Sequence, residues 1–258
     1  MEILLFFLLG TGVGLFGTLV GIGGGLICVP LFILLMTPST FSTAPQIVGT
    51  SLVIVFLNAL SGTFAYILQK RVFFQAAIPF ALATLPGAFL GSYIADKFNG
   101  NTLNLSFGIF LLLMATIMYW NSSRKKISEP NFDSHTFRYS KMLGISSSML
   151  VGFLSSIFGI GGGVIHVPMM IYLLHFPTHV ATATSHFVLA ISSFIGVISH
   201  FMLGHIVWLP AIGIGAGALI GAQIGAKISK KTKPKIILIL LSCSMFALGL
   251  RLILLGTP

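Results

Sequence analysis

The residues best suited to bind a ligand are two copies of the sequence Gly-Ile-Gly-Gly-Gly, at positions 21–25 and 159–163. Glycine disfavours a helix by roughly 1 kcal/mol per residue relative to alanine, so each copy should break a helix. A break exposes backbone N–H groups, and the helix that restarts after it directs its positive dipole end toward the break. The two breaks could bind one shared anion through Gly23, Gly24, Gly25, Gly161, Gly162 and Gly163. The alternative is that these glycines only allow helices to pack closely.

A Thr-Ser pair follows each glycine-rich sequence, Thr50-Ser51 in the first half of the chain and Thr184-Ser185 in the second. Their hydroxyl groups could donate hydrogen bonds to an oxyanion, or could instead bond back to carbonyl groups of their own helices. His186 directly follows the second pair, and His166 lies shortly after the second glycine-rich sequence. Because histidine titrates near neutral pH, either imidazole could attract an anion or carry a coupling proton. The alternative for both is a buried polar residue at a helix interface.

The sequence offers little for other kinds of chemistry. Its 4 acidic residues lie at the ends of apolar segments or between them, which excludes a proton relay of carboxylates inside those segments. It contains no His-Glu-x-x-His motif, no Walker A motif and no aspartate pair within an apolar segment. We therefore expect a protein that is not an enzyme and that binds no cofactor and no metal ion.

The composition indicates the environment that must position these residues. Of the 258 residues, 56% are hydrophobic and 7% are charged, against roughly 25% charged residues in a typical soluble domain. This excludes an ordinary cytosolic enzyme, a secreted disulfide scaffold and a disordered regulator. The net charge of +10 comes from residues in short gaps between apolar segments, so we expect no nucleic-acid partner. The sequence predicts an all-α polytopic membrane protein whose main partner is the lipid bilayer.

The apolar segments form two related halves. They fall at about 3–36, 46–69, 73–95, 102–120, 142–175, 180–204, 206–226 and 235–255. A polar stretch at 122–141 is interpreted as a cytoplasmic linker between a first membrane repeat, 1–121, and a second, 142–258. Residues 14–32 align without gaps with residues 152–170, and each of these segments contains one copy of the glycine-rich sequence. The chain is therefore a duplicated unit.

A second glycine pattern has a different interpretation. Gly213, Gly217, Gly221 and Gly225 recur every four residues, which places them on one face of a helix. Gly87 and Gly91 repeat this spacing in the first half. Such spacing predicts close packing between helices rather than a ligand site.

The charges favour one of two topologies. If 3–36 and 142–175 are single spans, the chain has eight simple spans in parallel repeats, and 8 basic residues face 6 across the membrane. If each glycine-rich sequence instead turns the chain back, each half is a broken helical hairpin followed by three transmembrane helices, and the repeats are inverted. Then 12 basic residues lie on one face and 2 on the other. The positive-inside rule favours this second arrangement, with the N-terminus outside the cell.

The duplicated glycine block, each copy followed by Val-Pro and a Thr-Ser pair, resembles the TauE/SafE family, the sulfite exporter or four-toluenesulfonate uptake permease family. The resemblance covers essentially the whole chain. It carries over Gly21, Gly23, Gly24, Gly25 and Pro30 in the first half, and Gly159, Gly161, Gly162, Gly163 and Pro168 in the second. Cys28 and His166 differ between the halves, so the motif assigns them no role.

The resemblance implies a plasma-membrane permease. We expect a secondary transporter of small sulfur-containing anions such as sulfite, sulfoacetate or other sulfonates, with the anion bound between the two breaks. Protons are the expected coupling ion, because histidine is the titrating residue type that the apolar segments contain. The alternatives are a passive anion channel and a membrane-embedded enzyme.

Overall fold

The computed structural model describes residues 2–35, 40–95, 97, 100–124, 132 and 136–256, and the regular elements in these ranges are helices. The first half contains α1 (Glu2–Val20), α2 (Gly25–Leu35), α3 (Ala44–Leu68), α4 (Phe74–Ala95) and α5 (Gly100–Arg124). The second contains α6 (Lys141–Phe158), α7 (Gly163–Pro168), the short π-helix η1 (Met169–Leu173), α8 (Thr178–Met202), α9 (Trp208–Lys231) and α10 (Pro234–Gly256). In the described ranges, 7 helices are long and apolar enough to cross a membrane. The all-α polytopic membrane fold is confirmed.

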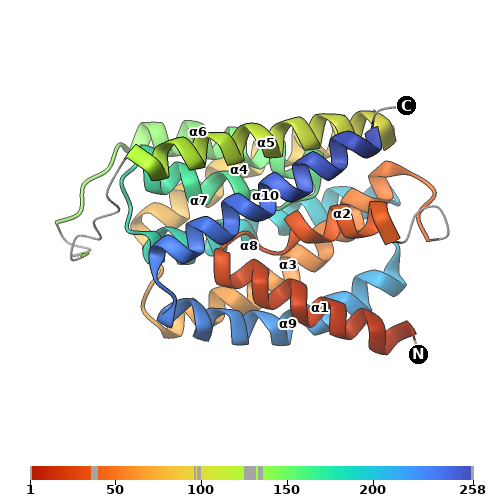
Figure 1. The fold of residues 1–258 in the computed structure, drawn as a ribbon, viewed down its shortest axis with the longest axis horizontal. Helices are drawn as coiled ribbons and strands as arrows, with labels where there is room; N and C mark the ends of the chain where they lie inside the picture. The colour runs from red at the N-terminus through yellow and green to blue at the C-terminus, as the bar shows by residue number, and fades with distance from the viewer. Residues whose placement is uncertain are drawn as a thin grey trace.

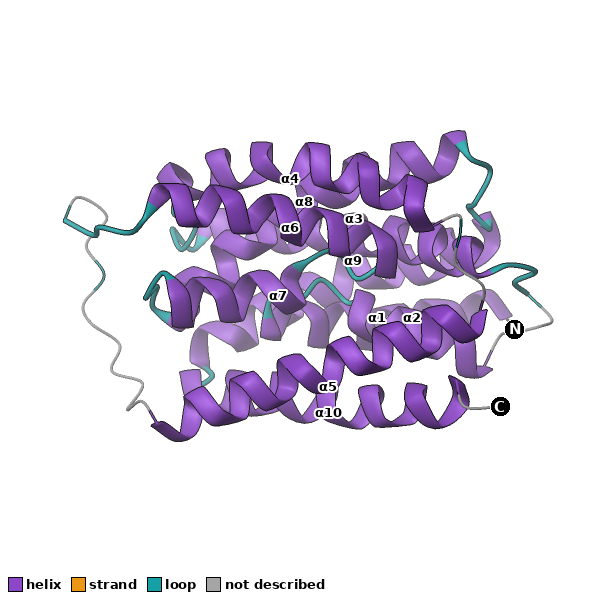
Figure 2. Ribbon diagram, turned by 90° about the horizontal axis from the view of Figure 1, so that it is seen from above, coloured by secondary structure: helices purple, strands orange, loops and turns teal. Residues whose placement is uncertain are grey.

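Each glycine-rich sequence turns the chain back on itself. Helix α1 runs inward from the end of the molecule that carries the N-terminus, and α2 returns toward that end (Figure 1). Helix α6 runs inward from the opposite end, beside the linker, and α7 returns there (Figure 2). The hairpins therefore enter from opposite ends, and each is followed by three long helices. The inverted repeat is confirmed, and the alternative of eight simple spans in parallel repeats is wrong.

The two ends of the molecule carry different loops. The turns between α3 and α4 and between α9 and α10 lie at the same end as the start of α6 (Figure 1). We call this the linker-side end, and we call the end with both termini the opposite end. Half of the predicted linker, 122–141, lies outside the described residues. Its described residues Phe137 and Tyr139 pack against Phe176 at ring-centroid distances of 4.7 and 5.3 Å. The boundaries of the two repeats stay a prediction.

Glycines allow the first helix of each hairpin to contact a helix of the other half. A Cβ atom added at Gly217 of α9 would lie 2.0 Å from the carbonyl oxygen of Phe7 in α1, and one at Gly221 would lie 2.1 Å from that of Thr11. In the related contact of α4 with α6, a Cβ atom at Gly87 would lie 2.1 Å from a carbonyl oxygen. The backbones touch directly, so the predicted packing role of these glycines is confirmed.

Helices α3 and α8 form the centre of the molecule. They pack on each other, α9 packs on α3, and α4 packs on α8. Helices α5 and α10 lie side by side at the outside of the molecule (Figures 1 and 2). Their exposed faces carry large apolar side chains such as Ile109, Leu113, Phe246 and Leu250, as expected for surfaces in contact with lipid. The two breaks therefore lie between an inner helix pair and the surrounding helices.

Candidate functional site

The two glycine-rich breaks meet at the centre of the molecule. A Cβ atom added at Gly25 would lie 2.6 Å from the Cα atom of Ile160, and one at Gly163 would lie 2.6 Å from that of Ile22. Each break therefore passes directly against the first residues of the other returning helix. Ile22 and Ile160 are both fully buried, so the two breaks meet inside the protein.

The backbone conformation of the breaks requires glycine. In the first break Gly21, Gly23 and Gly24 have φ angles of 88°, 75° and 80°, and the equivalent glycines of the second break have angles of 68°, 73° and 86°. Residues with a side chain rarely adopt this left-handed region. The glycines are thus needed for the turn itself, in addition to the close approach of the two breaks.

The breaks leave several backbone N–H groups without an acceptor. In the first break the N–H groups of Gly21, Ile22 and Gly23 donate to the carbonyl oxygen of Gly17. Within the described part of the chain, the N–H groups of Gly24 and Gly25 have no acceptor, nor do those of Gly162 and Gly163. Free N–H groups are normal at the start of a helix, but here they lie in the middle of a membrane protein. Their use as donors to an anion stays a prediction.

Two apolar side chains at equivalent positions of the inner helices cover the breaks. Val55 of α3 and Leu189 of α8 both contact Gly23 and Gly161. A Cβ atom at Gly23 would lie 2.1 Å from Leu189, and one at Gly161 would lie 2.3 Å from Val55. The predicted anion-binding glycines are therefore brought together next to the side chains of Val55 and Leu189.

The two serines of the Thr-Ser pairs have different surroundings. Ser51 Oγ donates to the carbonyl oxygen of Gly159 at 2.8 Å. Ser185 occupies the equivalent position in α8 and is fully buried, yet its Oγ atom has no hydrogen-bond partner in the described chain. Ser156 Oγ, at the end of α6, is likewise buried without a partner. Buried hydroxyl groups are nearly always hydrogen-bonded, so such atoms indicate a place for a bound ligand or water.

The threonines of these pairs hold the next helices in place. Thr50 Oγ1 accepts a hydrogen bond from the backbone N–H of Val207 at 3.0 Å, and Thr184 Oγ1 accepts one from that of Phe73 at 3.0 Å. Phe73 and Val207 directly precede α4 and α9, so each threonine fixes the start of a helix. A role for Thr50 and Thr184 in substrate binding stays a prediction.

His186 belongs to a buried polar cluster beside the first break. Its Nε2 atom lies 3.2 Å from Thr18 Oγ1, and the Oδ1 atom of Asn58 lies 3.2 Å from the same hydroxyl. The Tyr66 ring packs edge-on against the imidazole at 5.5 Å, and its hydroxyl donates to the carbonyl oxygen of Thr18. The Nδ1 atom of His186 is buried with no hydrogen-bond partner in the described chain.

Sequence reasoning missed Thr18, Asn58 and Tyr66 in this cluster. They lie inside apolar segments, and their equivalents in the other half are different residues, Ser156, Ser192 and His200. A search for exact repeats therefore passes over them. The available signal was that polar residues of some kind occupy these positions in both halves.

His166 lies apart from this cluster. Its Nε2 atom is 2.9 Å from Ser148 Oγ of α6, and its ring packs edge-on against Phe80 of α4 at 5.7 Å. These contacts place it between α4 and α6, whereas His186 contacts α1 and α3. Its buried Nδ1 atom also has no partner in the described chain. The structure does not bring the two predicted histidines together, and a binding role for His166 stays a prediction.

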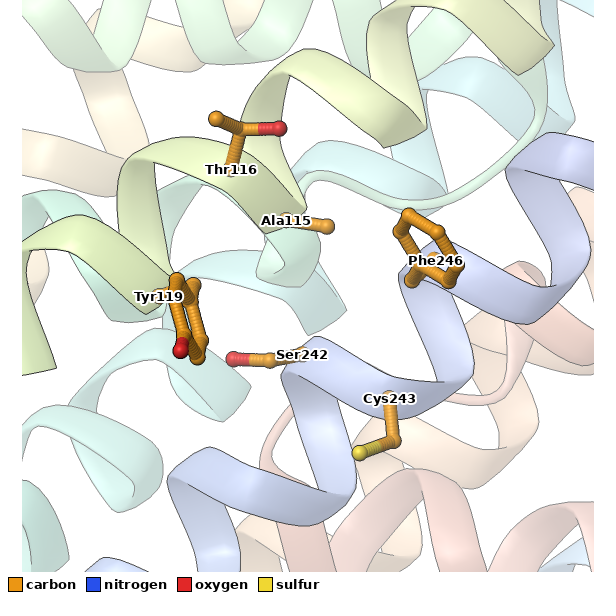
Figure 3. A pocket seen from close by; sticks show the side chains of 6 residues that line it. All are labelled: Ala115, Thr116, Tyr119, Ser242, Cys243 and Phe246. Atoms are coloured by element: carbon orange, nitrogen blue, oxygen red, sulfur yellow. The ribbon is translucent and has the colours of Figure 1, made fainter.

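A groove between α5 and α10 is separate from the breaks. It has a volume of about 360 Å³ and is lined by Ala115, Thr116, Tyr119, Ser242, Cys243 and Phe246 (Figure 3). Most of these side chains are exposed on the outer surface of the molecule. The groove therefore opens toward the lipid and shares no residue with the candidate site.

Comparisons with known proteins place the whole chain in one family. The family described as Sulfite exporter TauE/SafE matches residues 6–252. The chain is 34% identical to the Probable membrane transporter protein YunE of Bacillus subtilis, with 98% of each chain covered. It is 28% identical to the Probable membrane transporter protein MJ0441 of Methanocaldococcus jannaschii, with 97% of this chain and 95% of the relative covered. No solved structure gives a significant match. The chain therefore belongs to the TauE/SafE family, and it is a multi-pass membrane transporter rather than an enzyme.

Proposed function

We propose that this protein is a secondary transporter of small sulfur-containing anions, such as sulfite, sulfoacetate or another sulfonate, and that it binds the anion between the two breaks. The observation that carries this proposal is the meeting of two helix starts whose N–H groups lack acceptors, beside buried polar atoms that also lack partners. Each unsatisfied donor in a buried place costs free energy, and an oxyanion would satisfy several at once.

The chemistry of the site suits a group with several oxygen atoms. The N–H groups of Gly24, Gly25, Gly162 and Gly163 could donate to separate oxygens of a sulfite or sulfonate group, and the Ser185 hydroxyl could add another hydrogen bond. Val55 and Leu189 exclude water from the breaks, which strengthens hydrogen bonds to an anion. No lysine or arginine lies in the middle of a described helix near the breaks. An anion held by neutral donors is released more easily than one held by a buried cation, as a transporter requires.

His186 is the proposed site of the coupling proton. In the neutral imidazole one nitrogen carries a hydrogen and the other accepts. If Nε2 donates to Thr18, then Nδ1 is an acceptor and repels an anion until it takes up a proton. Binding of an anion next to Nδ1 would therefore favour proton uptake, which is the basis of coupled transport.

The proposed orientation in the membrane rests on the basic residues. Lys70, Arg71, Arg138 and the lysines at 227–235 belong to segments at the linker-side end (Figure 1). The positive-inside rule supports a cytoplasmic location for this end in a plasma membrane, and thus an N-terminus outside the cell.

The experiment that tests this proposal measures flux in proteoliposomes. Purified protein is reconstituted, and uptake of labelled sulfite, sulfoacetate and taurine-derived sulfonates is followed with and without a pH gradient. We expect saturable uptake that the pH gradient accelerates and that unlabelled sulfonate inhibits. Counterflow distinguishes a carrier from a channel. Only a carrier accumulates labelled substrate in vesicles that are preloaded with unlabelled substrate. Absence of flux for every sulfur anion would overturn the proposed substrate class.

A further inference from the structure

Arg71 is a charged side chain from a loop that reaches toward the buried centre. It follows Lys70 in the turn between α3 and α4, and Lys70 has a φ angle of 56°. Gly204 occupies the equivalent position in the turn between α8 and α9, with a φ angle of 72°. The first turn thus adopts, without glycine, a left-handed conformation that residues with a side chain rarely adopt. This turn directs the chain at Arg71 back over the end of α3.

The guanidinium group of Arg71 joins three helix ends. Its Nη2 atom lies 3.0 Å from Nδ1 of His179 at the start of α8, and donates to the carbonyl oxygen of the same residue at 3.1 Å. It also donates to Ser229 Oγ near the end of α9 at 3.4 Å. Its Nη1 atom donates to Gln69 Oε1 at 3.1 Å. These hydrogen bonds join the guanidinium to uncharged atoms, and they hold α3, α8 and α9 together at the linker-side end.

Tyr66 connects this group to the candidate site. The Cζ atom of Arg71 lies 4.8 Å from the centroid of the Tyr66 ring, which is the geometry of a cation–π contact. The Tyr66 ring also contacts His186, whose ring centroid lies 5.5 Å from that of Tyr66. The Tyr66 ring is fully buried, so it separates the guanidinium from the imidazole. Contacts therefore connect Arg71 at the linker-side end to His186 through the Tyr66 ring.

The opposite end has different residues at the equivalent positions. His200 replaces Tyr66, His205 replaces Arg71, and their Nδ1 atoms lie 3.1 Å apart. The two ends of an inverted repeat would otherwise be alike. Of these two positions, only the one at the linker-side end therefore has a permanent positive charge on a planar, bidentate donor group.

We propose that Arg71 is a specificity-determining residue of the transport pathway: it closes the linker-side end by packing over Tyr66, and it receives the substrate there by exchanging its hydrogen bonds with His179 and Ser229 for two oxygens of the anion. A guanidinium matches a sulfonate or sulfite group because two parallel N–H groups can donate to two oxygens. Its movement with the anion uncovers Tyr66 and opens the route to His186. The closing role is independent of the substrate, whereas the receiving role rests on the proposed function.

The test of the closing role measures access to the centre without measuring transport. In a chain with Cys28→Ser and Cys243→Ser, the substitution Ser185→Cys provides a single buried thiol. Impermeant methanethiosulfonate reagents, one cationic and one carrying a sulfonate, are applied to each face of sealed membranes in turn. A thiol at the exposed position 138 (Arg138→Cys in a separate chain) identifies the linker-side face. We expect Arg71→Ala to accelerate labelling by the cationic reagent from that face by about tenfold or more, the effect of losing hydrogen bonds to a charged group.

Matched variants separate the outcomes. Lys70→Gln removes a neighbouring positive charge on an exposed side chain, and it should leave the labelling rate unchanged. Labelling from the opposite face should also be unchanged in Arg71→Ala. Arg71→Lys keeps the charge but loses the planar group, and Ser229→Ala removes one hydrogen bond, so both should accelerate labelling less than Arg71→Ala. If Arg71→Ala does not fold, as judged by size-exclusion chromatography, these two variants give the result. Unchanged labelling in all Arg71 and Ser229 variants would overturn the closing role.

The receiving role is measured by flux. In Arg71→Lys, with cysteines restored, we expect the KM for the sulfur anion at the linker-side face to rise about tenfold with a smaller change in kcat. In Arg71→Ala, labelling by the sulfonate reagent should be accelerated less than labelling by the cationic reagent, because the sulfonate loses the guanidinium that receives it. A KM equal to that of the unmodified protein would overturn the receiving role. If the unmodified protein moves no sulfur anion, the proposed function fails, whereas the labelling result still decides the closing role.

Discussion

The Nε2 atom of His186 lies 3.2 Å from the hydroxyl oxygen of Thr18, although 168 positions separate the two residues in the chain. The amide group of Asn58 donates to the carbonyl oxygen of Gly14 at 2.9 Å, which turns its Oδ1 atom toward Thr18. Thr18 has a single hydroxyl hydrogen, and if it donates this to Asn58, His186 must donate from Nε2. The Nδ1 atom is then the one that can take up a proton.

The first prediction concerns pH. The imidazolium form of His186 increases as the pH falls, so anion binding should strengthen and KM should decrease at lower pH. His186→Gln keeps a hydrogen-bonding side chain of similar size but does not titrate, and it should flatten the dependence of KM on pH. Flux is measured in proteoliposomes between about pH 5.5 and 8, the range in which histidine ordinarily titrates. His175→Asn, at an exposed position, is the control and should retain the pH dependence. A pH profile that survives in His186→Gln would transfer the question to His166.

The second prediction concerns the contact between the breaks. Gly25 and Gly163 are the first residues of α2 and α7, and neither has a left-handed conformation, so alanine is compatible with the local backbone. A Cβ atom at either position would lie 2.6 Å from backbone of the other break and must push the breaks apart. We expect Gly25→Ala and Gly163→Ala to reduce flux by at least about tenfold, since a small displacement of binding groups costs this much or more.

The control for these variants is Gly12→Ala. Gly12 lies in α1, and a Cβ atom there would have no neighbour within 4 Å. Its substitution should leave flux and melting temperature nearly unchanged. Normal flux in Gly25→Ala and Gly163→Ala would show that the anion is not bound between the breaks. A loss of flux that is accompanied by a large fall in melting temperature would favour the packing interpretation of the glycines.

The third prediction separates structure from binding at the threonines. Thr50→Val and Thr184→Val keep the shape of the side chain but remove the acceptor for the backbone N–H groups of Val207 and Phe73. The loss should lower the stability by about 1–3 kcal/mol in Thr184→Val, because the N–H group of Phe73 is buried, and by less in Thr50→Val, because that of Val207 is part-buried. Thermal unfolding in detergent measures this effect, and KM should stay unchanged. A raised KM at unchanged melting temperature would instead place these hydroxyl groups in the binding site.

Much of the fold could be predicted because the chain repeats itself. The two Gly-Ile-Gly-Gly-Gly sequences and the distribution of basic residues were enough to predict the hairpins and their inversion. The positions at which the halves differ could not be assigned in this way. Arg71 is an example, because in the sequence it is one basic residue of a loop, and only the fold brings it over Tyr66. The hydrogen bond of Thr184 could not be predicted for another reason: Thr184 repeats Thr50, but the residue that it bonds, Phe73, is 111 positions away.

The last prediction concerns orientation. Lys70, Arg138 and Lys233 are exposed and belong to three separate segments at the linker-side end, whereas Lys97 follows α4 and is exposed at the opposite end. Single cysteines at these four positions, in a chain without Cys28 and Cys243, are labelled with an impermeant maleimide in intact cells and in inverted vesicles. The first three should react only in inverted vesicles, because positively charged loops remain in the cytoplasm. The cysteine at position 97 should react in intact cells. Reaction of the first three in intact cells alone would reverse the proposed orientation but keep the inverted repeat, since all three would still share one face.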